Sequence, residues 1–199
     1  MKTLKMMLAA VLLFAFTQSA DAQFRKKENN RVPDRFHMGL RAGITSNTYG
    51  GDVKNIDPLV FPTAGFALDF QVAPVPIFVG MGLNYVNYGC KTDYKDYDEC
   101  NSIHFPITAS YHINVAPNFF INPFFGGFIS YNFDAPLGLS EEVNYGMRLG
   151  CGINFGRLTF DIGYDLGLAN LGGDSYNGKV DVNTATVFMT IGFNWAGSR

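Results

Sequence analysis

Residues Asn144–Asn170, NYGMRLGCGINFGRLTFDIGYDLGLAN, decide the fold of this chain. Apolar residues alternate with polar residues and glycines on both sides of the pair Gly156-Arg157. A period of two is typical of a β-strand with two different faces, and a short glycine-containing turn joins two such strands into a hairpin. A two-residue turn would pair Phe155 with Leu158 and Arg148 with Asp165, which puts both apolar sets on one face.

Each strand of this hairpin is longer than the roughly 5–6 residues of an average globular strand, and it matches the ~9–11 tilted residues that cross a bilayer. The same alternation occurs in segments 36–45, 62–72, 78–88, 102–113, 119–133 and 182–195. The intervening segments are long at 46–61, 89–101, 134–143 and 171–181, and short at 74–76, 114–118 and 156–157. We therefore predict an all-β fold, an eight-stranded antiparallel up-and-down transmembrane β-barrel with short periplasmic turns and longer extracellular loops.

The beginning of the chain predicts export. Lys2 and Lys5 precede an apolar run that ends at Phe16, and Ala20-Asp21-Ala22 is a small-x-small cleavage site, so residues 1–22 are predicted to be a secretory signal peptide. The apolar run is shorter than the ~20 residues of a membrane-spanning helix. We divide the rest into a flexible periplasmic lead-in (23–35), an outer-membrane barrel domain (36–195) and a C-terminal tail (196–199).

The polar faces of the predicted strands carry glycine, small polar groups and a few charges, but no lysine and no glutamate. A soluble lipocalin-like carrier, the main alternative, would have Lys and Glu on its outer face. We expect the polar face to line the lumen, with ion pairs because isolated buried charge is unfavourable. The predicted luminal charges are Arg41 beside Asp69 on the next strand, Arg148 opposite Asp165, and Asp161. Eight strands leave an interior that side chains fill, so a plugged lumen is favoured over an ion or proton path.

Aromatic residues gather at the two ends of the predicted strands. Membrane barrels place such residues in two girdles at the bilayer interfaces, whereas β-propensity alone does not explain their position at strand ends. The predicted girdle residues are Tyr85, Tyr131 and Tyr145 near the long loops, and Tyr111, Phe155, Phe193 and Trp195 near the short turns.

The segment between Cys90 and Cys100 has two further features. In an exported protein these two cysteines predict a disulfide that closes a short loop. The loop is rich in carboxylates, at Asp93, Asp96, Asp98 and Glu99. Calcium binding or a partner contact is possible there, but the spacing matches no known calcium loop, so a solvated loop is favoured.

Several segments resemble the PorT-like outer-membrane β-barrel family of Gram-negative bacteria. They are IHFPITASYHI (103–113), FFGGFISY (124–131), NYGMRLGCGINFGRLTFDIGYDLGLANL (144–171) and FMTIGFNW (188–195). The resemblance implies a bacterial outer-membrane barrel, inserted with the help of periplasmic chaperones and the barrel-assembly machinery. The family's namesake resembles a secretion accessory factor, but many members have no assigned role.

The candidate chemistry of the chain is sparse. Ser110 and His112 lie near the short-turn end of a strand with no acid in phase beside them, so luminal hydrogen bonding is favoured over an outer-membrane enzyme. No pattern points to a cofactor or metal site, and no basic run in the strands indicates nucleic-acid binding. We expect a non-enzymatic outer-membrane barrel, structural or interaction-presenting. Its expected partners are outer-membrane lipid and, at the loops, an extracellular or protein partner.

Overall fold

The computed structural model describes residues 36–51, 56–72, 75–92, 95–98, 100–133, 142–172, 174–175, 178–179 and 181–196. They all fall within one compact unit, Asp34–Arg199. The predicted signal peptide (1–22), the predicted lead-in (23–35) and residues 197–199 of the predicted tail lie outside the described residues.

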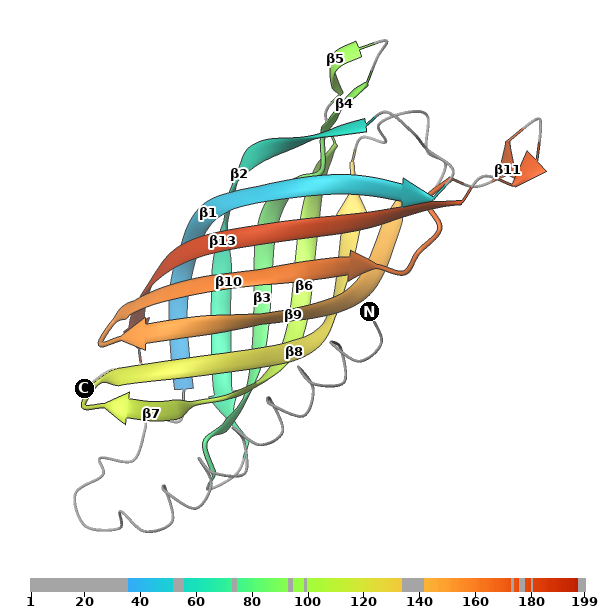
Figure 1. Ribbon diagram of the computed structural model, residues 1–199. Coiled ribbons are helices and arrows are strands. Elements are labelled where there is room, and N and C mark those ends of the chain that lie inside the picture. Colours follow the sequence, from blue (N-terminus) through green and yellow to red (C-terminus); the bar gives the residue numbers. More distant parts are fainter. Residues whose placement is uncertain are drawn as a thin grey trace, which may run out of the picture. The chain divides into compact units, whose positions relative to one another are not determined.

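Eight long strands form the barrel wall. They are β1 (Phe36–Gly51), β2 (Ile56–Gln71), β3 (Ile77–Asn87), β6 (Asn101–Tyr111), β8 (Phe119–Asn132), β9 (Val143–Phe155), β10 (Leu158–Gly167) and β13 (Val182–Ala196). Each strand pairs antiparallel with its sequence neighbour, and β13 pairs with β1, which closes the sheet (Figure 1). The predicted eight-stranded antiparallel up-and-down barrel is confirmed.

Five short strands lie in segments predicted as loops or turns, or continue a barrel strand. They are β4 (Cys90–Thr92), β5 (Lys95–Asp98), β7 (Ile113–Ala116), β11 (Asp174–Ser175) and β12 (Gly178–Lys179). β4 pairs with the first residues of β2, so the sheet extends beyond the barrel wall at the long-loop end. β7 pairs with the start of β8 and shortens the turn predicted at 114–118. None of the described residues forms a helix long and apolar enough to span a membrane.

The predicted loop 46–61 is wrong. β1 continues to Gly51 and β2 begins at Ile56, so most of this segment belongs to strands. Asn47 and Tyr49 point inward and are 0% and 5% exposed, respectively. In this segment of β1 both the inward and the outward residues are polar. It therefore shows no alternation of apolar and polar residues, and its sequence resembles that of a loop.

The hairpin of β9 and β10 has the predicted register. Phe155 pairs with Leu158 and Arg148 with Asp165 across a turn in which Gly156 has φ 58°. That left-handed conformation favours glycine and suits the tight turn. β10 ends at Gly167, which is earlier than the alternation suggested.

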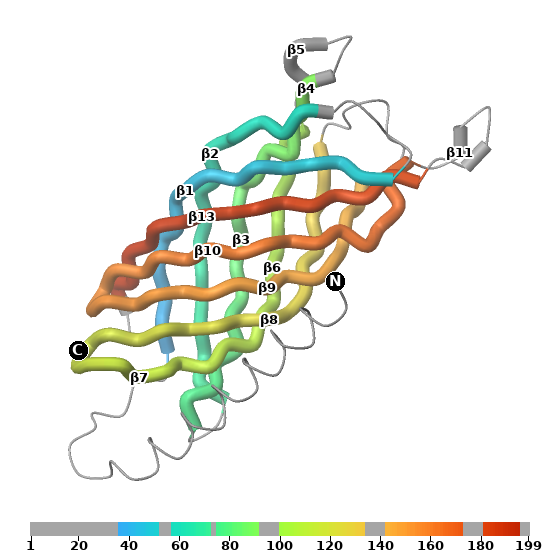
Figure 2. Tube along the Cα trace, in the orientation of Figure 1, coloured from blue at the N-terminus to red at the C-terminus, as the bar shows by residue number. Residues whose placement is uncertain are grey.

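The strands are strongly staggered around the barrel, as the tube in Figure 2 shows by the crossing of front and rear strands. One row of paired residues runs from His37 through Asp69, Gly80, Thr108, Gly126, Arg148, Asp165 and Thr186 to Asn47. The circuit returns to β1 ten residues further along, from position 37 to position 47. This stagger tilts the strands and brings residues from distant parts of the sequence to one level.

The two faces of the wall have opposite character. Most outward residues of the barrel strands are apolar, as Ile191 shows with 63% exposure, whereas most inward residues are polar and buried, as Thr186 shows with 2%. Six of the predicted girdle residues are exposed on the outer face and the seventh, Tyr111, is half-buried. They are Tyr85, Tyr131 and Tyr145 towards the long loops, and Phe155, Phe193 and Trp195 towards the short turns.

Candidate functional site: the barrel lumen

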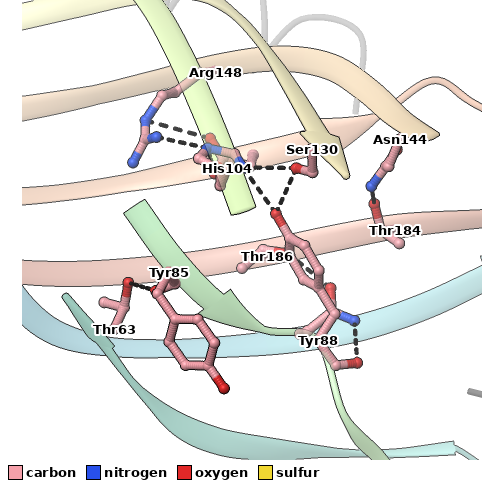
Figure 3. A network of polar contacts seen from close by, with 11 residues as sticks. Thr63, Tyr85, Tyr88, His104, Ser130, Asn144, Arg148, Thr184 and Thr186 are labelled. Carbon is pink, nitrogen blue, oxygen red and sulfur yellow. Dashed lines mark hydrogen bonds and ion pairs between the residues drawn. The ribbon is translucent and has the colours of Figure 1, made fainter. Parts of the chain in front are cut away.

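A polar network occupies the long-loop half of the lumen (Figure 3). Its centre is His104 on β6, which is 1% exposed. Arg148 Nη1 lies 2.9 Å from His104 Nε2, while the Ser130 hydroxyl and the Tyr88 hydroxyl lie 2.8 Å and 2.9 Å from His104 Nδ1. Asp165 approaches from β10 and completes the group.

The contacts of His104 fix the protonation state of its ring. A guanidinium only donates hydrogen bonds, so Nε2 must accept from Arg148 and carries no proton. Nδ1 then holds the proton and donates to Ser130 or Tyr88. Because of this, the 3.4 Å approach of Asp165 Oδ2 to Nε2 is not an ion pair, and the imidazole is neutral.

Arg148 is the cation of this network. Its Nε lies 3.5 Å from Asp165 Oδ1, and its guanidinium carbon lies 3.8 Å from the centre of the Phe188 ring. The structure therefore brings together the Arg148–Asp165 pair that the hairpin register predicted. Sequence reasoning missed Phe188, although its inward phase on the last strand was available.

The second predicted pair needs correction. Arg41 does not pair with Asp69: its Nε lies 3.3 Å from Asp161 Oδ2, and its Nη1 donates to Asn194 at 2.9 Å. Arg41 is level with Gly65 on β2, four residues from Asp69, and its chain extends the other way, over Gly192 of β13. Gly192 has no side chain to obstruct it, so Arg41 reaches β10, two strands away.

An aromatic stack fills the short-turn end of the lumen. The ring of Phe78 is 0% exposed, and its centroid lies 3.8 Å from that of His112 and 5.3 Å from that of His37. The two imidazole centroids are 5.8 Å apart, so the three rings form a triangle. All three planes are nearly parallel. His112 was predicted as a luminal group, whereas Phe78 was missed, although it shares the inward phase of Gly80 and Gly82.

The long-loop end is held by Tyr88. Its backbone carbonyl accepts from the Tyr49 hydroxyl at 2.7 Å and from Asn47 Nδ2 at 3.3 Å. Its ring packs with Val86 and Cys100 in a buried apolar cluster. This end of the lumen is thus covered by residues of β1 and of the segment after β3.

The predicted Cys90–Cys100 disulfide is not formed in the structure. The two side chains pack in different clusters: Cys90 with Tyr49 and Leu171, and Cys100 with Val86 and Tyr88. Both are almost fully buried. Asp93 and Glu99 lie outside the described residues, and of Asp96 and Asp98 only the backbone, in β5, is described.

Side chains fill most of the lumen, but they leave a cavity of about 120 Å³ in its middle. The charged residues that line it are Arg41, Asp69, Arg148, Asp161 and Asp165, which are the five luminal charges named from the sequence. No group of three or more His, Cys, Asp or Glu side chains suited to a metal ion occurs in the described part of the chain. Ser110 and His112 also line the cavity.

Residues 17–173 match the protein family described as outer membrane protein beta-barrel domain. The match covers most of the chain, and the chain therefore belongs to this family. It is an outer-membrane β-barrel protein, with an apolar outer wall and a polar, largely filled lumen.

Similar solved structures are also small barrels. Ail, the attachment invasion locus protein of Yersinia pestis, is 12% identical with a TM-score of 0.45, and the alignment covers 80% of this chain and 98% of Ail. Neisserial surface protein A is 12% identical with a TM-score of 0.44, over 78% of this chain and 96% of that protein. The outer membrane enzyme PagL is 10% identical with a TM-score of 0.43, over 75% and 97%. No curated protein sequence matches the chain.

Proposed function

We propose that this protein is a non-enzymatic resident of the bacterial outer membrane that presents its long loops to partners outside the cell. The observation that supports the proposal most is the contrast between its two faces: the apolar outer wall suits lipid, and the luminal charges are largely paired with one another. Such a barrel needs no ligand to fold, and its variable surface is the set of loops between the long strands.

The nature of the wall argues against a soluble ligand carrier. A lipocalin-like barrel keeps an apolar ligand inside and a charged surface outside. Here the interior is lined by Arg41, Asp161 and Arg148, while Leu149 and Ile191 are exposed outside. Apolar ligands would meet paired charges in the lumen, and the outer wall would aggregate in water.

Within the family, we propose that the chain is a PorT-like member, on the four segments quoted above. This grouping suggests a second role, as an accessory factor in protein secretion. In either role the barrel is the anchor and the loops make the contacts. Export through a cleaved signal peptide, residues 1–22, is part of the same proposal.

Two measurements test the location and the role. Fractionation of cells that express the full chain should recover it in the outer membrane without its first 22 residues, and unheated samples should migrate faster on gels than boiled ones. Crosslinking from the predicted loop 134–143 should capture a protein partner, whereas crosslinking from the outer wall should capture lipid. Recovery in the soluble periplasm, or hydrolysis of outer-membrane lipid by the purified barrel, would contradict the proposal.

A further inference from the structure

We propose that the luminal cavity is a binding site for one monovalent cation, Na⁺ in the first instance, held with water at its short-turn end beside Asp69. The inference rests on the geometry of the closed barrel and is independent of the role of the loops.

The charges around the cavity do not balance. Three carboxylates, Asp69, Asp161 and Asp165, line it with two guanidiniums, Arg41 and Arg148. Asp161 is paired with Arg41 and Asp165 with Arg148, which leaves Asp69 without an ion pair among the described residues. At pH 8, where ordinary imidazoles are neutral, the cavity therefore carries one excess negative charge, three minus two.

Asp69 lines the cavity from β2. It pairs with Gly80 on β3, and a Cβ placed at Gly80 would lie 2.7 Å from Asp69 Oδ1 and 2.8 Å from Thr108 Oγ1. The carboxylate and the hydroxyl of the next strand therefore both lie over Gly80, closer than a side chain at that position would allow. A carboxylate inside the barrel requires a donor or a cation, because uncompensated charge in the interior is strongly unfavourable.

Two amides provide further acceptors at the same end of the barrel. Asn122 Oδ1 and Asn154 Oδ1 have no hydrogen-bond partner, and these side chains are only 6% and 8% exposed. Both line the cavity. Asn122 is the fourth residue of β8, Asn154 is the last but one of β9, and Asp69 lies two residues before the end of β2, so all three are near the short turns.

The chemistry of the site selects the ligand. Carboxylate, amide and hydroxyl oxygens favour hard cations and water over transition metals. One positive charge cancels the excess, whereas a divalent ion would leave the cavity positive. A volume of about 120 Å³ has room for a small ion together with several water molecules. The quaternary nitrogen of choline is surrounded by methyl groups, so the oxygens of the site cannot coordinate it.

The test uses the full folded barrel in an uncharged detergent at pH 8, where ordinary imidazoles are neutral. The melting temperature is followed as choline chloride is replaced by NaCl at constant ionic strength, and ²³Na relaxation is measured on the same samples. We expect a saturable rise of the melting temperature with Na⁺ and a broadened ²³Na signal. Asp69→Asn should abolish both effects, and Asn122→Ala should weaken Na⁺ binding by about tenfold.

Asp57→Asn is the matched control, because Asp57 is an exposed carboxylate at the other end of the same strand. It should leave both effects unchanged. Equal melting temperatures in sodium and choline, or an undiminished sodium effect in Asp69→Asn, would overturn the proposal. If Asp69→Asn does not fold, K⁺ is added instead to the wild-type barrel in NaCl. Loss of the ²³Na broadening then supports a saturable luminal site, and broadening that persists overturns the proposal.

Discussion

Arg148 and Asp165 face each other across the β9–β10 ladder and lie within 3.5 Å in the interior of the barrel. The turn that joins their strands sets this register, and the Phe188 ring covers the guanidinium from β13. The pair thus links the hairpin to the strand that closes the barrel.

Replacing Arg148 by Ala should destabilise the barrel, because Asp165 would lose its ion-pair partner and His104 its hydrogen-bond donor. Loss of one partner of a buried ion pair costs about 3–5 kcal/mol. The measurement is urea-induced unfolding in detergent or lipid vesicles. Arg157→Ala, in the exposed turn, is the control and should change stability by less than about 0.5 kcal/mol. Adding Asp165→Asn to Arg148→Ala should recover part of the loss; a strictly additive double variant would contradict the pairing.

Gly192→Ala should disturb the second ion pair. A Cβ at this position would lie 2.4 Å from Arg41 Cδ and 2.5 Å from Arg41 Nη1, so the arginine chain must move away from Asp161. We expect a loss of about 1–3 kcal/mol, as for other overpacked interiors. Gly50→Ala is the matched control, since nothing lies within 4 Å of its added Cβ. Equal unfolding midpoints for the two variants would refute the assigned path of Arg41.

Phe78→Ala should open the short-turn end of the lumen. The buried ring packs against both His37 and His112, and its removal should cost about 3–5 kcal/mol and raise the conductance of the barrel in planar bilayers. Phe125→Ala removes an equal ring from the outer face, where Phe125 is 56% exposed, and should leave conductance unchanged. A conductance that is the same in both variants would show that the stack does not close the lumen.

The chain has a single tryptophan, Trp195, which reports on the predicted short-turn girdle. It is 42% exposed on the outer wall and packs against Phe66. In vesicles its fluorescence should be quenched more strongly by bromine near the headgroup than by bromine at the end of the acyl chain. The opposite order, or no quenching, would place this rim away from the interface.

The sequence was enough to predict features that depend on the local alternation of apolar and polar residues. It was not enough to predict side-chain pairs that form only when the barrel closes. The β9–β10 register followed from Gly156 and the two-residue turn, so the alternation alone was enough to match Arg148 with Asp165. Arg41 was assigned to its neighbour Asp69 because the stagger of the barrel, which brings Asp161 within reach, is set only when all eight strands close. The Cys90–Cys100 disulfide failed for a related reason: proximity in sequence did not reveal that the two thiols pack in different clusters.

The pairing of β1 with β13 has a consequence for how the protein is made. This ladder runs from Met38 to Gly51 and joins the two ends of the barrel domain, which are the most distant in sequence. Contacts of such separation form slowly, because the whole intervening chain must be ordered before they can be gained. Until β13 arrives, both edges of the sheet stay open to pairing with other chains. A chain that loses its last strand therefore loses this ladder and leaves two unpaired edges, at β1 and at β10.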